Sequence, residues 1–233
     1  MTRSKLLGAI FALPLMIAGA GSAQANIIGL TIDGSSSISA ADFTLQKQGY
    51  INALTALLNT NGSNTIGVWQ FSNNVQSVFT LTTINSAAAK TALLNAINGM
   101  SQIGSTTAIG DSINTARIAI NAFVGGFGNK IIDVSTDGVN NTGADPTTAA
   151  NAAFATGIKV NCLGIGGSAN CNFNNAPGVG VDFLAGGFAE FEAAVRTKLS
   201  AELTPTPEPM TLTLFGAGLA GAALMRRRRA KKA

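Results

Sequence analysis

The chain has 233 residues, of which 46% are hydrophobic and 11% charged, and its formal net charge is +4. It contains no histidine, which excludes Ser-His-Asp and Cys-His catalytic arrangements and removes the commonest general base. The positive charge belongs to the two ends, because residues 26–204 contain seven basic and ten acidic side chains, a net charge of −3. This acidic middle gives nucleic-acid binding no electrostatic support, and we expect no nucleic-acid partner.

Residues 1–25 have the pattern of a secretory signal peptide. Arg3 and Lys5 precede an apolar run over residues 6–20, and Ala23-Gln24-Ala25 has the small-x-small form of a cleavage site. Retention as a membrane anchor is the alternative, but the apolar run is short and the cleavage site follows it. We therefore expect an exported protein whose mature chain starts at Asn26.

Residues 26–204 are predicted to form one domain in which strands and helices alternate. A hairpin turn is expected at residues 72–74, between two of the strands. Strands are expected at residues 27–32, 65–71, 75–81, 130–136 and 158–165, with a further edge strand at 179–184. Helices are expected at residues 39–58, 84–100, 109–123, 147–155 and 188–203. This order predicts an α/β domain, with a doubly wound, Rossmann-like, mostly parallel sheet and helices on both faces.

The first predicted strand ends in Asp33-Gly34-Ser35-Ser36-Ser37. Ser39 and Asp42 follow with capping-box spacing, so the stretch lies on a turn between a strand and a helix. Ligands bind at the carboxyl ends of the strands in open parallel sheets. Asp33, Ser35 and Ser37 offer one carboxylate and two hydroxyls, which suit Mg²⁺, Mn²⁺ or Ca²⁺ better than zinc.

Asp-x-Ser-x-Ser after a first strand resembles the metal-ion-dependent adhesion site (MIDAS) of the von Willebrand factor type A (vWA) domain. Residues 105–111, Ser-Thr-Thr-Ala-Ile-Gly-Asp, resemble that family's threonine loop, and residues 131–138 resemble its strand ending in Thr-Asp-Gly. The family's spacing before glycine selects Thr107. Thr106 stays open as the alternative, because Ser105-Thr106 stands where the family usually has Gly-Gly or Gly-Ser. The resemblance extends over residues 26–203 and is greatest to exported bacterial vWA domains.

The resemblance implies a metal site and a mode of binding. Asp33, Ser35, Ser37 and Thr107 would ligate a divalent cation, Mg²⁺ first and Mn²⁺ or Ca²⁺ as alternatives, while Asp137 would act through water. An acidic group of a partner would fill the open position on the ion. The role of Asp133, four residues before Asp137, stays open at this point.

Cys162 and Cys171 are the only cysteines, nine positions apart. An even number of cysteines in an exported protein predicts a Cys162–Cys171 disulfide, with two free thiols as the alternative.

Residues 205–233 resemble the PEP-CTERM sorting signal. Pro205-Thr206-Pro207-Glu208-Pro209 precedes an apolar stretch over residues 211–225, and six arginines and lysines close the chain. The apolar stretch has fifteen residues, fewer than the ~20 that a spanning helix usually needs. The resemblance implies a short transmembrane span that anchors the protein transiently in the inner membrane until an exosortase removes it. A permanent C-terminal anchor is the alternative.

Together these features predict a surface- or matrix-associated adhesion module that engages an acidic partner, a protein or a matrix ligand, through a bound cation. The alternative is a structural extracellular-matrix protein whose metal only stabilises the fold. A hydrolase is less favoured because the sequence shows no base for it, and we expect no enzymatic activity.

Overall fold

The computed structural model describes residues 25–125 and 127–204. The predicted signal peptide, except Ala25, and the predicted sorting tail lie outside these residues. Within the described ranges, no helix is both long enough and apolar enough to cross a membrane.

Within the described residues, the domain contains six strands, five α-helices and one short 3₁₀ helix. In chain order they are β1 (Ala25–Asp33), α1 (Ala40–Leu57), β2 (Asn64–Phe71), β3 (Val75–Thr83), α2 (Ala87–Asn98), α3 (Ile109–Ala122), β4 (Phe127–Thr136), α4 (Pro146–Phe154), β5 (Lys159–Ile165), η1 (Asn172–Asn174), β6 (Asp182–Ala185) and α5 (Phe191–Glu202).

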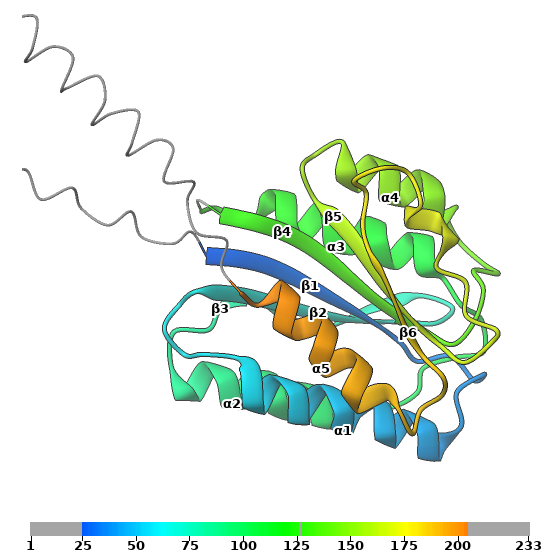
Figure 1. Ribbon diagram of the computed structural model, residues 1–233, viewed down its shortest axis with the longest axis horizontal. Coiled ribbons are helices and arrows are strands. Elements are labelled where there is room, and N and C mark those ends of the chain that lie inside the picture. Colours follow the sequence, from blue (N-terminus) through cyan, green and yellow to red (C-terminus); the bar gives the residue numbers. More distant parts are fainter. Residues whose placement is uncertain (1–24, 126, 205–233) are drawn as a thin grey trace, which may run out of the picture. The chain divides into compact units, whose positions relative to one another are not determined.

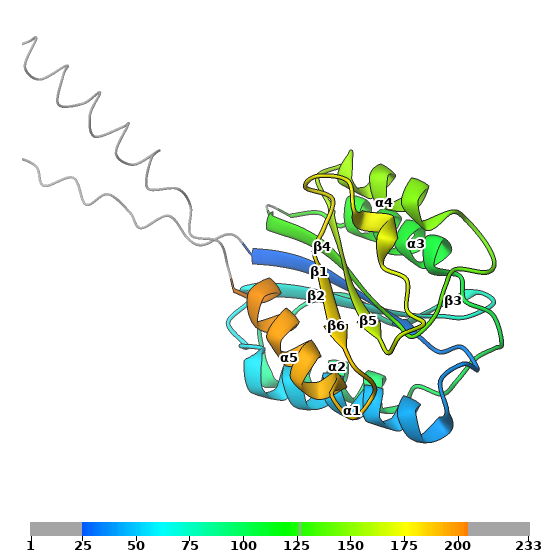
Figure 2. The ribbon, with the colours of Figure 1, turned by 45° about the vertical axis from the view of Figure 1, so that its right-hand side comes forward.

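The strands form one sheet in the order β3-β2-β1-β4-β5-β6. Every neighbouring pair is parallel except β2 and β3, which form the predicted antiparallel hairpin. Helices α1, α2 and α5 cover one face of the sheet, and α3 and α4 cover the other (Figures 1 and 2). The predicted α/β fold with a mostly parallel sheet is confirmed.

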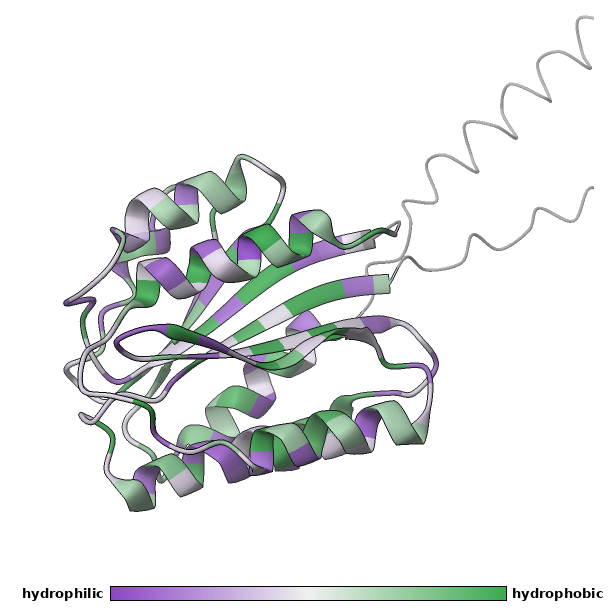
Figure 3. Ribbon diagram, turned by 180° about the vertical axis from the view of Figure 1, so that it is seen from behind, coloured by the Kyte–Doolittle hydropathy of each residue, from purple (hydrophilic) through white to green (hydrophobic). Residues whose placement is uncertain are grey.

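Each face of the sheet has its own hydrophobic core, because successive side chains of a strand point to opposite faces. Ile28, Leu30 and Ile32 of β1 pack with α1, α2 and α5. Ile27, together with Trp69 and Phe71 of β2, packs with α3 and α4. Figure 3 shows the resulting hydrophobic stretches along the central strands.

Two helices are shorter than their sequence patterns predict. Residues 84–100 were expected to be helical, but α2 begins at Ala87, because the Ser86 hydroxyl accepts a hydrogen bond from Ala89 N and caps the helix there. Ile84 precedes this cap and is fully buried, so its place in the apolar pattern reflects core packing outside the helix. Likewise, α5 begins at Phe191 and not at Phe188, which lies in the loop before it.

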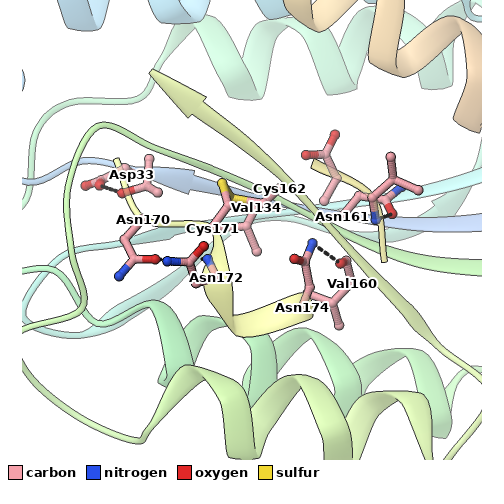
Figure 4. The surroundings of a disulfide bond; sticks show 12 residues. Asp33, Val134, Val160, Asn161, Cys162, Asn170, Cys171, Asn172 and Asn174 are labelled. Carbon is pink, nitrogen blue, oxygen red and sulfur yellow. Dashed lines mark hydrogen bonds between the residues drawn. A yellow bond between two sulfur atoms is a disulfide. The ribbon is translucent and has the colours of Figure 1, made fainter. Parts of the chain in front are cut away.

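The predicted disulfide is present and joins Cys162 of β5 to Cys171 in the loop after it (Figure 4). Cys171 and Phe173 thereby join the core beneath α3 and α4. Asn174 Nδ2 then donates to Val160 O at 3.0 Å, which holds the same loop against the start of β5. In the chain-entropy estimate, closing a loop of about ten residues stabilises a domain by roughly 2.5–3 kcal/mol.

Candidate metal centre

The predicted site residues lie where the two central strands end. β1 and β4 are adjacent and parallel, with Ile32 opposite Ser135. Asp33 therefore ends β1 beside Thr136 and Asp137, although 104 positions separate the two aspartates in the sequence. The parallel pairing of these strands brings together the first and third parts of the vWA-like pattern.

Asp33 is fully buried and its carboxylate is held on both sides. Oδ1 accepts a hydrogen bond from Ser35 N at 2.9 Å, and Oδ2 accepts one from Thr136 Oγ1 at 2.6 Å. Burial raises the pKa of Asp33 from 3.8 to about 6; hydrogen bonds from Thr136 and Ser35 act against this rise, and the charge of Asp137 adds to it. At neutral pH the site thus contains a desolvated carboxylate with a second carboxylate nearby.

A hydrogen-bonded chain of oxygen atoms lies beside this buried carboxylate and reaches the surface. Ser35 Oγ and Ser37 Oγ are 2.9 Å apart, and Ser37 Oγ donates to Asp137 Oδ1 at 2.7 Å. Ser35 is buried, Asp137 is partly exposed and Ser37 is exposed. The Ser35 and Ser37 hydroxyls and the Asp137 carboxylate therefore form one hydrogen-bonded chain with one end open to solvent, and the Ser35 N–H links it to Asp33.

Gly34 fixes the course of this turn. Its N–H donates to Phe71 O at 2.8 Å, which ties the end of β1 to the end of β2. A Cβ on Gly34 would overlap the side-chain amide of Gln70. A side chain at residue 34 would therefore require Gln70 to move, and with it the hydrogen bond that Gln70 Nε2 donates to Ser101 O.

The threonine loop reaches the same edge of the sheet through contacts with the loop after β4. Thr107 N donates to Asn141 Oδ1 at 2.8 Å, and Asn141 N donates to Thr107 O at 3.1 Å. Thr107 Oγ1 lies 3.9 Å from the position that a Cβ on Gly138 would occupy. The Thr107 hydroxyl therefore lies beside the residue that follows Asp137.

Thr106 lies in a different environment. Its N–H donates to Asn73 Oδ1 at 3.0 Å, and its buried hydroxyl has no hydrogen-bond partner among the described residues. The Thr106 carbonyl oxygen accepts a hydrogen bond from Ser72 Oγ at 2.8 Å, so the turn between β2 and β3 helps to hold Thr106 in place. These contacts favour Thr107 over Thr106 as the threonine of the site.

The donor set fits a hard cation. It contains two carboxylates and three hydroxyls, and no group of three or more His, Cys, Asp or Glu side chains that could hold a metal occurs within residues 25–125 and 127–204. Neighbouring oxygens around an octahedral Mg²⁺, bound at about 2.0–2.1 Å, lie about 2.8–3.0 Å apart. The 2.9 Å between Ser35 Oγ and Ser37 Oγ is compatible with this spacing and is also the distance of an ordinary hydroxyl hydrogen bond.

Three residues support the site although the sequence analysis gave none of them a role in it, and only Thr136 lay within a motif, the Thr-Asp-Gly of residues 136–138. Thr136 orients Asp33, Asn141 fixes Thr107, and Asn73 Oδ1 accepts hydrogen bonds from the threonine loop. Asn73 had an expected role only as a turn residue, and its contacts join residues more than thirty positions apart. Of these three residues, a short-range sequence pattern could have indicated only Thr136, because it directly precedes Asp137.

Asp133, whose role the sequence left open, is not part of this site. It is fully buried and forms an ion pair with Lys198 of α5. The side chain thus points into the core beneath α5, away from the open end of the oxygen chain.

Residues 26–207 match the family described as "Protein of unknown function (DUF1194)". The chain belongs to this family. Residues 205–229 match the PEP-CTERM protein-sorting motif, as predicted for the tail. A search among curated proteins found no match.

Solved structures with the same fold include vWA domains and a byssal protein. Proximal thread matrix protein 1 (PTMP1) from the mussel byssus has a TM-score of 0.61 and 28% identity, covering 77% of this chain and 48% of that chain. A second structure of PTMP1, at 25% identity, TM-score 0.60 and the same coverage, has a "zinc occupied MIDAS motif". A von Willebrand factor type A protein from Catenulispora acidiphila has a TM-score of 0.64 and 17% identity, covering 77% of this chain and 43% of that chain. The chain spans about half the length of PTMP1.

The buried charge of Asp33 predicts that Asp33→Asn stabilises the protein in EDTA at pH 7.5, by roughly 1–3 kcal/mol. The folded state holds the proton up to about pH 6, whereas the unfolded state loses it near 3.8, so wild-type stability falls as pH rises between these values. Residue 33 of the Asp33→Asn variant cannot ionise, so the variant does not lose this stability as pH rises. The difference in the free energy of unfolding between variant and wild type should therefore shrink towards pH 4. Urea unfolding at both pH values measures the difference. A difference that does not change with pH would contradict this explanation.

Proposed function

We propose that this domain is an exported binding module that holds one divalent cation and engages an acidic group of its partner through that cation. The observation that carries the proposal is the hydrogen-bonded chain of oxygens from Ser35 through Ser37 to Asp137, which is open to solvent at Ser37 and linked to the buried Asp33 carboxylate by Ser35 N. Mg²⁺ is the ion that we propose, because carboxylate and hydroxyl oxygens suit a hard cation, with Mn²⁺ as the nearest substitute.

The charges of the site support binding of an acidic partner. Asp33 would be the one carboxylate in direct contact with the ion, and Asp137, already hydrogen-bonded to Ser37, would act through water. Ser35, Ser37 and Thr107 add neutral oxygens. Because Asp33 would be the one carboxylate bound directly, a divalent ion with its direct protein ligands would keep a net positive charge and an open coordination position, which a carboxylate of the partner can fill.

The surface next to the site is hollowed and can receive a partner. A depression of ≈380 Å³ begins at Ser37 and Asp137 and extends over the loops after β5 and β6, where Gly166, Gly167 and Phe188 line it. Glycines leave backbone groups accessible there, and Phe188 adds an apolar contact. A partner would thus touch both the cation and a surface beside it.

The proposed place of action is the cell surface or the extracellular matrix. The PEP-CTERM motif supports export with transient inner-membrane anchoring and processing by an exosortase. Proteins of similar fold include the pilus adhesin SpaC from Lactobacillus rhamnosus GG, at 17% identity and a TM-score of 0.62, with 78% of this chain and 30% of that chain covered.

A structural matrix protein, in which the cation only stabilises the fold, is the second candidate. The similarity to a thread matrix protein favours it. The two candidates differ in what Asp33→Ala does: it abolishes ligand binding in a folded protein if the site binds a partner, and it weakens folding alone if the site is structural. We propose no enzymatic activity for either.

Metal binding to the folded state should raise the melting temperature. At a hundredfold excess over Kd the stabilisation is about 2.7 kcal/mol, or roughly 5–10 °C for a domain of this size. Mg²⁺ or Mn²⁺ should produce the shift in the wild type, and Asp33→Ala should abolish it because the directly ligating carboxylate is lost. Thr107→Ala should reduce the shift.

Thr106→Ala is the matched control, because Thr106 is the neighbouring threonine and its hydroxyl has no hydrogen-bond partner in the described part of the chain. This variant should keep the full metal-induced shift. A wild-type melting temperature indifferent to Mg²⁺, Mn²⁺ and Ca²⁺ up to millimolar concentrations would reject the metal site.

Partner binding should require the cation. We expect the immobilised protein to retain a component of extracellular matrix extract in Mg²⁺, to release it in EDTA, and to lose it in Asp33→Ala, with Thr106→Ala as the folded control. Poly-glutamate should compete with this component, because its carboxylates can fill the open position. Retention that is unchanged in EDTA would contradict the proposed mechanism.

A further inference from the structure

A second charged cluster lies inside the domain, between the sheet and α5. Asp133 of β4 and Asn161 of β5 are paired across adjacent strands, so their side chains point to the same face. Lys198 and Glu202 lie one turn apart on α5, which covers that face. Lys198 and Asp133 are fully buried, Glu202 is 3% exposed and Asn161 is 6% exposed.

The cluster has few hydrogen bonds for the number of charged side chains that it contains. Lys198 Nζ contacts Asp133 Oδ1 and donates to Val134 O at 3.2 Å. Glu202 Oε1 accepts from Asn161 Nδ2 at 2.7 Å. Asp133 Oδ2 and Glu202 Oε2 have no hydrogen-bond partner within the described residues. A buried ion pair is costly unless hydrogen bonds satisfy all of its polar atoms, and here two carboxyl oxygens are left over.

The number of hydrogens on Lys198 Nζ also fits an uncharged nitrogen better than a charged ammonium. An ammonium group has three N–H donors, and the described residues offer Nζ two acceptors, Asp133 Oδ1 and Val134 O. An amide nitrogen has one N–H, which Val134 O alone can accept. The surroundings of Nζ thus satisfy an amide more completely than they satisfy an ammonium.

The dry core also favours the neutral forms of these groups. Burial lowers the pKa of Lys198 to about 8, although the charge of Glu202 acts against this shift. Burial likewise raises the pKa of Glu202, against the opposing effects of Lys198 and Asn161. Burial therefore shifts both groups towards their neutral forms, an amine that can act as a nucleophile and a carboxylic acid.

We propose that Lys198 and Asp133 condense into an intramolecular isopeptide bond, with Glu202 as the proton relay. Lys198 Nζ, as the neutral amine, attacks Cγ of the protonated Asp133 carboxyl. Glu202 gives its proton to the departing hydroxyl and receives one from the nitrogen, so that it ends protonated as it began. One N–C bond forms, one C–O bond breaks, and one water molecule leaves, without an oxidant or any other reactant.

Position and burial both promote this reaction. The fold holds amine and carboxyl in contact, which replaces a bimolecular encounter by an intramolecular one. The product would join α5, the last helix before the C-terminal tail, covalently to the central strand β4. Tension applied at the C-terminal end of α5 would then reach the middle of the sheet without unwinding α5 first.

Peptide mapping of the full chain tests this proposal. Trypsin should yield a branched peptide in which residues 131–159 are joined to a peptide that begins at Thr197 and is uncut after Lys198. Its mass should be lower than the sum of the two by one water molecule. Cleavage after Lys159, which is exposed at the start of β5, serves as the internal control for complete digestion.

Three variants sharpen the test. Lys198→Arg keeps the charge but should leave the peptides unlinked, because a guanidinium is not nucleophilic. Asp133→Asn should still link, with loss of ammonia in place of water. Glu202→Gln should leave most of the protein unlinked while it stays folded; full linkage in this variant would overturn the relay role. Unlinked wild-type peptides, with trypsin cutting after Lys198, would overturn the proposal itself.

Discussion

The hydrogen bond from Thr136 to Asp33 joins the ends of the two central strands, and the candidate metal centre depends on it. Thr136 Oγ1 donates a hydrogen bond to one carboxylate oxygen of Asp33 at 2.6 Å, and Ser35 N donates one to the other at 2.9 Å. The carboxylate is therefore held in one orientation before any ion binds. A preorganised ligand loses little conformational freedom on binding, so this arrangement would increase the affinity of the proposed site for a cation.

The same constraint determines where the remaining oxygens lie. Because Thr136 turns inward to Asp33, the next residue, Asp137, lies at the partly exposed edge and accepts from Ser37. The threonine loop reaches this edge through Asn141 and Asn73, which bind its backbone and leave the Thr107 hydroxyl beside Gly138. The site is thus assembled from three loops, and the parallel pairing of β1 and β4 sets its position.

Much of the fold and of the site could be predicted from sequence because the signals are local. Asp33, Ser35 and Ser37 lie within five residues, Ser39 caps α1 as its capping-box spacing predicts, and the two cysteines allow a single pairing. The supporting roles of Thr136, Asn73 and Asn141 depend on contacts between distant segments, which periodicity does not encode. The pairing of Asp133 with Lys198 depends on which turn of α5 faces β4. The sequence shows only that the two side chains carry opposite charges.

A crystal grown with Mn²⁺ tests the central claim most directly, because anomalous scattering locates this metal without ambiguity. The account predicts one strong anomalous peak in contact with carboxylate and hydroxyl oxygens of Asp33, Ser35 and Ser37, with Thr107 as a further ligand and Asp137 one water away. A peak elsewhere on the domain, or none at these oxygens at millimolar Mn²⁺, would contradict it.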